Sequence, residues 1–158
     1  MERIDILELE RDDPLLDQVE RLFVDFYASM AEQGWVLPLV EGGEKIWRRS
    51  IEKTLGKLAV LVVAVADKRV LGFAQGVLRV GPTYLGGQRL GVVTHIYLVP
   101  EGRSKGVSRR MVKQLEVWFR QKDVHSCELN AIWKNSTSIE FWEHMGYERE
   151  LLQMRKVL

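Results

Sequence analysis

The hydrophobic pattern changes its period several times along the chain, and each change marks a predicted element. Apolar residues three or four positions apart predict helices, whereas alternating or continuous short apolar runs predict strands. Helices are expected over residues 15–34, 44–58, 107–121 and 137–146. Strands are expected over residues 3–9, 58–66, 70–80, 90–99 and 127–133, and residues 147–158 are expected to close the chain as one strand or a short hairpin.

The resulting order is β-α-α-β-β-β-α-β-α-β(-β), a mixed α/β (α+β) pattern. Residues 58–66 are rich in valine and leucine, which is typical of a strand buried on both faces. Asp67 and Lys68 are expected to form the turn of a hairpin with the next strand. Strands and helices of this number pack in layers around one core. No linker interrupts the pattern, so residues 1–158 are expected to form a single domain.

Composition places the chain among globular proteins. Hydrophobic residues make up 46% and charged residues 28%, and the longest apolar run is far too short to span a membrane. Cys127 is the one cysteine, so an intrachain disulfide is impossible and a reducing, cytoplasmic location is expected. Cys127 and the three histidines lack the spacing of metal ligands, so no metal is expected.

The formal net charge is only +1, but it is unevenly distributed. Residues 1–58 carry 13 acidic and 8 basic side chains, a net of −5, and residues 59–158 carry a net of +6. Seven basic residues lie between Arg103 and Lys122. They fit an anion site or a solvated helix face equally well, and they are too local for a duplex-binding stripe. Nucleic-acid binding is therefore not expected.

The strand over residues 90–99 leads directly into the basic helix through a turn of small residues. The first amides of a helix have no intrahelical acceptor, and the helix dipole adds positive potential there. Gly106 would let the backbone approach a phosphate closely. Arg103, Lys105, Arg109 and Arg110 add charge. The P-loop and Rossmann patterns fit less well, since the first needs Gly-Lys-Ser/Thr and the second needs three spaced glycines.

Two motifs at this point resemble those of the GNAT superfamily of acetyl-CoA-dependent N-acetyltransferases. Arg103-Ser104-Lys105-Gly106-Val107-Ser108 is similar to the family's Arg/Gln-x-x-Gly-x-Gly/Ala turn, with serines at positions 104 and 108 in place of the common small residues. Downstream, Asn135, the aromatic pair Phe141 and Trp142, and the sequence Gly146-Tyr147 resemble the family's second motif. The resemblance implies a mostly antiparallel central sheet flanked by helices.

The resemblance also implies how the coenzyme is held. Backbone groups of the strand before the turn would bond the pantetheine arm, the turn amides would bind the pyrophosphate, and the Asn135 side chain would bond the coenzyme arm. An asparagine at this position also fits a helix cap. The coenzyme residues implied are Ile96, Tyr97, Leu98, Arg103, Ser104, Lys105, Gly106, Val107, Ser108, Arg109, Asn135 and Trp142.

The implied reaction is direct acyl transfer from the thioester to an amine. The Leu98 N–H is the candidate donor for the developing oxyanion. Many family members place a tyrosine acid at the position of Trp142, whose indole N–H is no useful acid. Tyr97 is the candidate replacement, although a strand tyrosine also fits the core. His95 is the candidate base or substrate contact, since its ordinary pKa lies near neutrality; a hydrogen-bonded histidine in the sheet is the alternative.

Family relatives bind the acceptor between the first helix pair and the loop before the turn strand. Here these segments are residues 32–44, which carry Glu32, Trp35, Glu41 and Glu44, and residues 81–88. Acidic and aromatic groups suit a cationic amine. The leading hypothesis is therefore a small-molecule amine acetyltransferase. The alternatives are an acetyltransferase for protein lysines or N-termini and a non-catalytic acyl-CoA-binding module, and a homodimer is left open.

Overall fold

The structure is a computed structural model that describes residues 2–158. Its centre is a five-stranded sheet in which the strands follow their chain order, and only the β4–β5 pair is parallel. The strands are β1 (Asp5–Glu8), β2 (Ala59–Ala66), β3 (Arg69–Val80), β4 (Arg89–Leu98) and β5 (Ser126–Leu129). The predicted mixed, mostly antiparallel sheet flanked by helices is confirmed.

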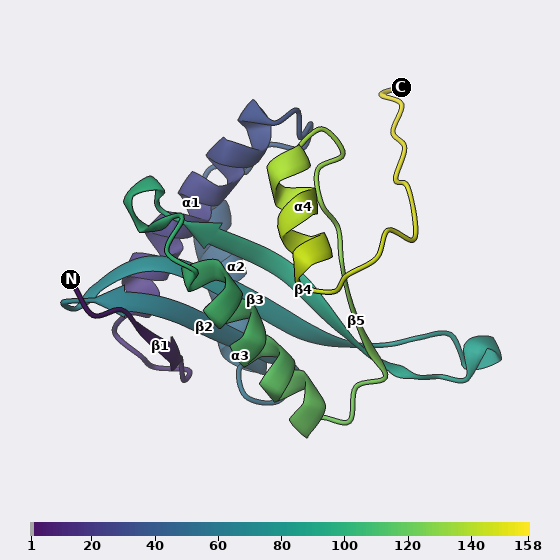
Figure 1. The fold of residues 1–158 in the computed structure, drawn as a ribbon, viewed down its shortest axis with the longest axis horizontal. Coiled ribbons are helices and arrows are strands. Elements are labelled where there is room, and N and C mark those ends of the chain that lie inside the picture. Colours follow the sequence, from purple (N-terminus) through teal and green to yellow (C-terminus); the bar gives the residue numbers. More distant parts are fainter. Residues whose placement is uncertain (1) are drawn as a thin grey trace.

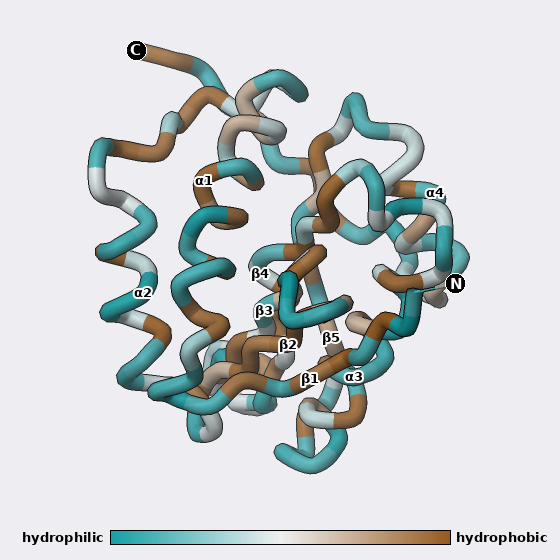
Figure 2. The backbone as a smooth tube through the Cα atoms, turned by 90° about the vertical axis from the view of Figure 1, so that its left-hand side faces the viewer, coloured by the Kyte–Doolittle hydropathy of each residue, from teal (hydrophilic) through white to brown (hydrophobic). Residues whose placement is uncertain are grey.

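Four helices cover the two faces of the sheet. They are α1 (Leu16–Glu32), α2 (Gly43–Thr54), α3 (Val107–Gln121) and α4 (Ser136–His144). Helices α1 and α2 lie on one face, and α3 and α4 lie on the other (Figures 1 and 2). Short 3-10 turns at Thr83–Leu85 and Pro100–Gly102 flank β4. Within residues 2–158, no helix has both the length and the hydropathy needed to cross a lipid bilayer.

The core is centred on β2, whose eight residues are all buried. It lies between β1 and β3 and has helices on both faces, which explains why its sequence is continuously apolar. On the α3 side, Phe119 packs where β3 and β4 carry glycines. A Cβ atom at Gly76 would lie 2.6 Å from the Phe119 ring, and one at Gly91 would lie 2.8 Å from it. These glycines let α3 approach the sheet closely.

Most predicted boundaries are confirmed to within a few residues, and two deviations have clear causes. Asp67 and Lys68 both have positive φ angles and form the predicted hairpin turn between β2 and β3. Helix α2 ends at Thr54, earlier than predicted, because Leu55 is already extended and Gly56 adopts a φ of +81°. Strand β5 ends at Leu129 instead of Trp133, since the chain turns away from β4 beyond that point.

The predicted terminal strand or hairpin over residues 147–158 is wrong. This segment has no regular secondary structure, and several of its apolar side chains are exposed, including Leu151 and Met154. A strand needs a neighbouring edge about 4.8 Å away to bond its backbone. Figure 1 shows instead that the yellow C-terminal segment rises past α4, away from β5. Its alternating pattern therefore has no sheet edge to pair with in this chain.

Candidate active site

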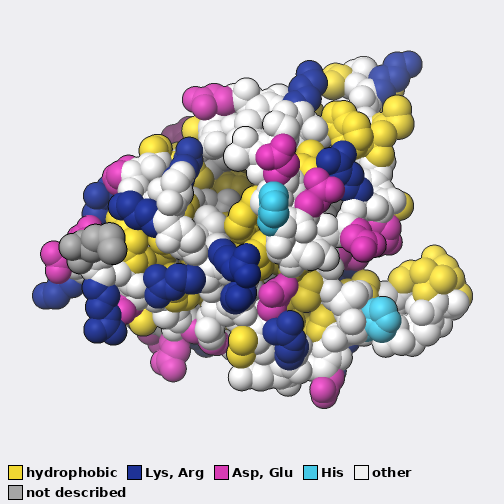
Figure 3. All heavy atoms as spheres, in the orientation of Figure 1, with side chains coloured by type: hydrophobic (Ala, Val, Ile, Leu, Met, Phe, Trp, Pro, Cys, Tyr) yellow, Lys and Arg dark blue, Asp and Glu magenta, His cyan; other side chains and the backbone are white. Residues whose placement is uncertain are grey.

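The candidate site is the cleft that opens where β4 and β5 separate. The two strands pair only from Leu90 to Val93 on β4 and from Ser126 to Leu129 on β5. Beyond these pairs they enclose a cavity of about 1090 Å³ together with α1, α4 and the N-terminal end of α3. Figure 3 shows this hollow, with Lys and Arg side chains along the margin formed by the start of α3.

Beyond Val93, the cleft-facing edge of β4 has no strand partner among residues 2–158. Val99 donates its N–H to Leu71 O on the β3 side. Because successive residues of a strand turn their backbone groups to opposite edges, Ile96 and Leu98 present theirs to the cleft. Tyr97 lies opposite Phe73 and presents its backbone groups to β3. Of the three predicted backbone positions, Ile96 and Leu98 therefore have the orientation that a pantetheine arm needs.

The turn into α3 has the geometry expected of an anion cradle. Gly106 caps the helix with a φ of +72°, and a Cβ atom there would meet nothing within 4 Å. Ser104 also has a positive φ, 64°, which explains why a small, permissive residue is favoured at that position. The cleft is lined by Ser104, Gly106, Val107, Ser108 and Arg109.

Only some of the basic side chains predicted to bind an anion at the turn line the cleft. Arg109 lines it, and Lys105 is not among its lining residues. Arg110 donates a hydrogen bond of 3.0 Å to Ile4 O, and so supports β1 instead of the anion site. Arg103 lines the cleft but folds back: its Nε donates to Leu98 O at 2.9 Å, and its guanidinium lies over the Tyr97 ring.

Asn135 and Trp142 both line the cleft, and both have structural partners. The Asn135 side chain accepts a hydrogen bond from Ser138 N at 3.0 Å as the cap of α4, and it donates to Gln33 Oε1 at 2.6 Å. The helix-cap interpretation, left open by the sequence, is therefore the arrangement present here. Trp142 is buried and packs edge-on against Phe141 and Tyr147.

His95 belongs to a hydrogen-bonded chain that sequence reasoning missed. Its Nε2 lies 3.2 Å from the Tyr27 hydroxyl, and its Nδ1 lies 2.9 Å from Thr94 Oγ1. The Thr94 hydroxyl donates to Gln75 O, so it accepts from Nδ1–H of His95. The Nε2 atom is then unprotonated and accepts from Tyr27. No local motif could reveal this pair, because Tyr27 lies on α1, far from β4 in the sequence.

The surroundings of His95 weaken it as a base. Burial lowers its pKa to about 4, because the surrounding aromatic rings of Phe23, Phe26 and Phe73 cannot solvate an imidazolium. An acceptor ammonium has a pKa near ~10, so proton transfer to His95 would be strongly uphill. His95 is better placed to orient Tyr27. Burial also raises the pKa of Tyr27, which therefore remains a protonated phenol near neutral pH.

Tyr97 remains a candidate acid. Its side chain lines the cleft, and burial, with a smaller contribution from Asp25, raises its pKa. A phenol with a raised pKa keeps its proton at neutral pH and can donate it.

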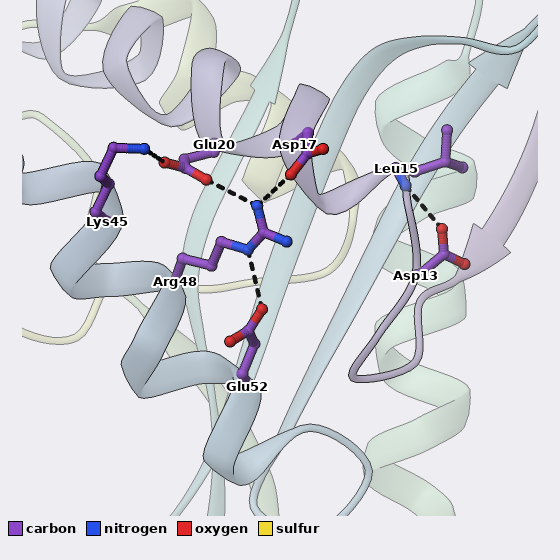
Figure 4. A network of polar contacts seen from close by, with 7 residues as sticks. All are labelled: Asp13, Leu15, Asp17, Glu20, Lys45, Arg48 and Glu52. Carbon is purple, nitrogen blue, oxygen red and sulfur yellow. Dashed lines mark hydrogen bonds and ion pairs between the residues drawn. The ribbon is translucent and has the colours of Figure 1, made fainter.

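The acidic acceptor surface expected from the sequence is absent from the cleft. Trp35 lines it, but Glu32, Glu41 and Glu44 do not. Three other carboxylates of the first 58 residues are paired with basic side chains between α1 and α2. The network in Figure 4 joins Asp17 and Glu20 of α1 to Lys45, Arg48 and Glu52 of α2.

The loop over residues 81–88 was also expected beside the acceptor, and this expectation is wrong. The β3–β4 hairpin is long, and its tip projects away from the cleft (Figure 1). None of its residues lines the cavity, and Tyr84 is 86% exposed. The C-terminal segment takes this place instead: Leu151, Leu152 and Arg155 line the cleft, and Arg155 lies 5.4 Å from the centre of the Trp35 ring.

Among the described residues, those that line the cleft form no metal-binding cluster and include no cysteine. Across residues 2–158, no cluster of His, Cys, Asp and Glu is arranged as a metal site. Cys127 lies on β5 and does not line the cleft. Burial, with the nearby carboxylate of Glu116, raises its pKa and keeps it a thiol.

Comparisons with known proteins agree with this geometry. The family model described as the acetyltransferase (GNAT) family matches residues 16–147. Among solved structures, aminoglycoside N-acetyltransferase AAC(6')-Iy in complex with CoA is 16% identical, with a TM-score of 0.79 and coverage of 99% of this chain and 96% of that chain. A predicted acetyltransferase from Clostridium acetobutylicum with acetyl-CoA is 19% identical, with a TM-score of 0.74 and coverage of 97% and 96%.

A third structure is an aminoglycoside acetyltransferase from an uncultured soil metagenomic sample, in complex with sisomicin. It is 14% identical, with a TM-score of 0.72 and coverage of 98% of this chain and 96% of that chain. At these identities the structures show the shared fold. No curated protein sequence matches the chain significantly. The family model carries the assignment, because it spans most of the chain: the protein belongs to the GNAT family of acetyl-CoA-dependent N-acetyltransferases.

Proposed function

We propose that this chain transfers an acetyl group from acetyl-CoA to the amine of a small molecule, by direct attack in a ternary complex. The observation that carries the proposal is a side-chain contact that spans the acceptor end of the cleft. Trp35, in the loop after α1, and Arg155, in the C-terminal segment, meet across it. A protein lysine or N-terminus would need an open groove there. We further propose that residues 1–158 act as one domain.

The coenzyme half fits acetyl-CoA. The open space at Gly106 and the first amides of α3 suit the pyrophosphate, and the free edge of β4 at Ile96 and Leu98 suits the pantetheine arm. Bound acetyl-CoA supplies an activated acetyl group as a thioester. The Leu98 N–H then offers a donor at the point where negative charge develops on the carbonyl oxygen. Arg103 holds the carbonyl of the same residue and so fixes the local backbone.

The acceptor half orients the amine through Tyr27. Since its proton is committed to His95 Nε2, the Tyr27 oxygen keeps lone pairs for an N–H of the incoming amine. His95 is a positioning residue in this scheme. With no strong base in contact, the amine reacts as its free-base fraction, so kcat/KM rises with pH up to the pKa of the acceptor amine. The Tyr97 phenol donates its proton to the leaving thiolate, and the proton that the acceptor nitrogen loses restores the phenol through solvent.

The proposal is tested by release of free thiol from acetyl-CoA with a panel of small amines and lysine-containing peptides. Turnover with small amines and none with peptides is the expected result. Turnover with peptides alone would transfer the assignment to a protein acceptor. Tight CoA binding without thiol release from any amine would favour the non-catalytic module suggested by Trp142, and absence of CoA binding would overturn the site itself.

A further inference from the structure

We infer that the acceptor is an amine with an apolar or aromatic body and a carboxylate, such as an aromatic amino acid, and not a polycation. This inference rests on the proposed small-molecule acetyl transfer and specifies its substrate class. It departs from the aminoglycosides named for two of the similar structures.

The charges lining the cleft are of one sign. Among residues 2–158, no aspartate or glutamate lines it, and its charged side chains are Arg103, Arg109 and Arg155. An acceptor with several ammonium groups would lose water there without gaining a carboxylate partner, and it would be repelled by the arginines. Asp25 and Glu32, each next to a lining residue of α1 or of the loop after it, are exposed and do not line the cleft.

The three arginines divide between the two ends of the cleft. Arg103 and Arg109 belong to the turn at the start of α3, where the coenzyme phosphates are expected. Arg155 lies on the C-terminal segment and contacts Trp35, at the opposite end. It is therefore the cation available to the acceptor. A guanidinium pairs best with a carboxylate, which can accept two parallel N–H bonds.

Trp35 supplies an independent observation. Its indole Nε1–H is covered and has no hydrogen-bond partner among the described residues. This group is a donor only, so whatever satisfies it must bring an acceptor atom. Buried polar groups are rarely left unpaired in native proteins. Binding must first uncover this N–H; a carboxylate held by Arg155 would then bring acceptor oxygens to both groups, whereas another cation would bring none.

Apolar side chains also line the cleft, together with polar ones such as Gln33 and Gln153. The apolar ones include Phe26, Met30, Val36, Trp133, Leu151 and Leu152. Such walls stabilise a hydrophobic or aromatic body by removing it from water. The combination of an apolar wall, one arginine and an unpaired indole donor describes an amphiphilic amino acid more closely than a sugar that carries several amines.

The test compares phenylalanine, phenethylamine and kanamycin as acceptors in thiol release. Phenethylamine is phenylalanine without its carboxylate, and kanamycin is a polycation. We expect kcat/KM for phenylalanine to exceed that for phenethylamine by about 10-fold or more, equivalent to about 1.4 kcal/mol. Kanamycin should be the poorest acceptor. Equal or better turnover of phenethylamine or kanamycin would overturn the inference while leaving the small-amine function intact.

The Arg155→Glu variant tests whether Arg155 causes the preference for phenylalanine over phenethylamine. This side chain is exposed, so the fold should tolerate the change. The variant should lose at least about 10-fold in kcat/KM for phenylalanine and lose none for phenethylamine. Lys156→Glu is the matched control, because it makes the same charge change one residue away and does not line the cleft. Equal effects of both variants would indicate a general field and contradict a direct role of Arg155.

Calorimetry separates the two proposals. Phenylalanine should bind the CoA-loaded protein and bind the Arg155→Glu variant at least about 10-fold more weakly. Binding without thiol release from any acceptor would end the catalytic proposal and retain the acceptor class. Absence of phenylalanine binding would end the inference about the acceptor.

Discussion

The two ends of the cleft are built by different means. The coenzyme end is made of backbone: the free edge of β4 at Ile96 and Leu98 and the amides that follow Gly106. The acceptor end is made of side chains from distant segments, namely the Tyr27–His95 pair and the Trp35–Arg155 contact. Backbone geometry depends on a few small residues in a short motif. Side-chain geometry depends on packing across the whole fold, and so it can differ between members that share the motif.

The largest expected effect comes from breaking the backbone end at Gly106. Gly106→Val places a β-branched residue at a φ of +72°, which strains the turn, and it puts a side chain into the open space beside the helix amides. The Kd for CoA, measured by calorimetry, should rise about 100-fold or more, or about 2.7 kcal/mol.

Gly56→Val is the matched control for this change. Gly56 has a φ of +81° and equally open surroundings, but it lies between α2 and β2 and does not line the cleft. This variant should lose stability and keep its affinity for CoA. A similar loss of affinity in both variants would mean that backbone strain, and not the anion cradle, is being measured.

The side-chain end is tested next by Tyr27→Phe. This change removes the hydroxyl that donates to His95 and leaves the ring packed against Phe23 and Phe26. We expect kcat to fall about 10- to 100-fold, within the range of a lost orienting contact, with an unchanged Kd for CoA. Tyr147→Phe is the control, since that phenol bonds Glu116 outside the cleft. An unaltered kcat would remove Tyr27 from the mechanism.

Asn135 also lines the cleft, and its substitution tests whether coenzyme binding depends on this side chain. Asn135→Ala removes the cap of α4 and should lower the free energy of unfolding by about 1 kcal/mol. Because both polar atoms of the amide are engaged by protein groups, the Kd for CoA should change little. Asn135→Asp retains the cap oxygen and should recover most of the stability. A tenfold weaker CoA complex in both variants would instead assign the amide to the coenzyme, as family resemblance implies.

The smallest expected effect concerns Ser104, whose φ of 64° suits glycine better. Ser104→Gly removes a left-handed strain of roughly 1–2 kcal/mol but gives the unfolded chain more freedom, so a net stabilisation of at most about 1 kcal/mol is expected in chemical denaturation. Asp123→Gly is the control, with a φ of 54° after α3 and outside the cleft. Both should stabilise, and only Ser104→Gly should tighten CoA binding. A weaker CoA complex would show that the serine itself contacts the coenzyme.

The sequence by itself determined most of the elements, their order along the chain and the turn of small residues before α3. A continuous apolar run located β2, which is buried on both faces, and helical periodicity located α3, which buries one face. The turn at residues 103–108 was equally accessible, because left-handed backbone and unpaired helix amides require small residues at fixed positions. A role for the β4 backbone was expected only from the family resemblance, and the pairing register showed that Ile96 and Leu98, and not Tyr97, turn their backbone to the cleft.

The geometry of the proposed acceptor end could be determined only from the tertiary structure. Tyr27 and His95 are 68 residues apart and carry no shared motif, and the burial that lowers the pKa of His95 is invisible in the chain. The alternation of residues 147–158 indicated a strand, but a strand forms only where an edge is available to bond it. Likewise, the acidic residues Glu32, Glu41 and Glu44 suggested a cationic acceptor, but in the folded chain none of them lines the cleft. Long-range contacts decide such features, because side chains from distant segments meet only when the fold packs them together. The local sequence pattern does not record those contacts.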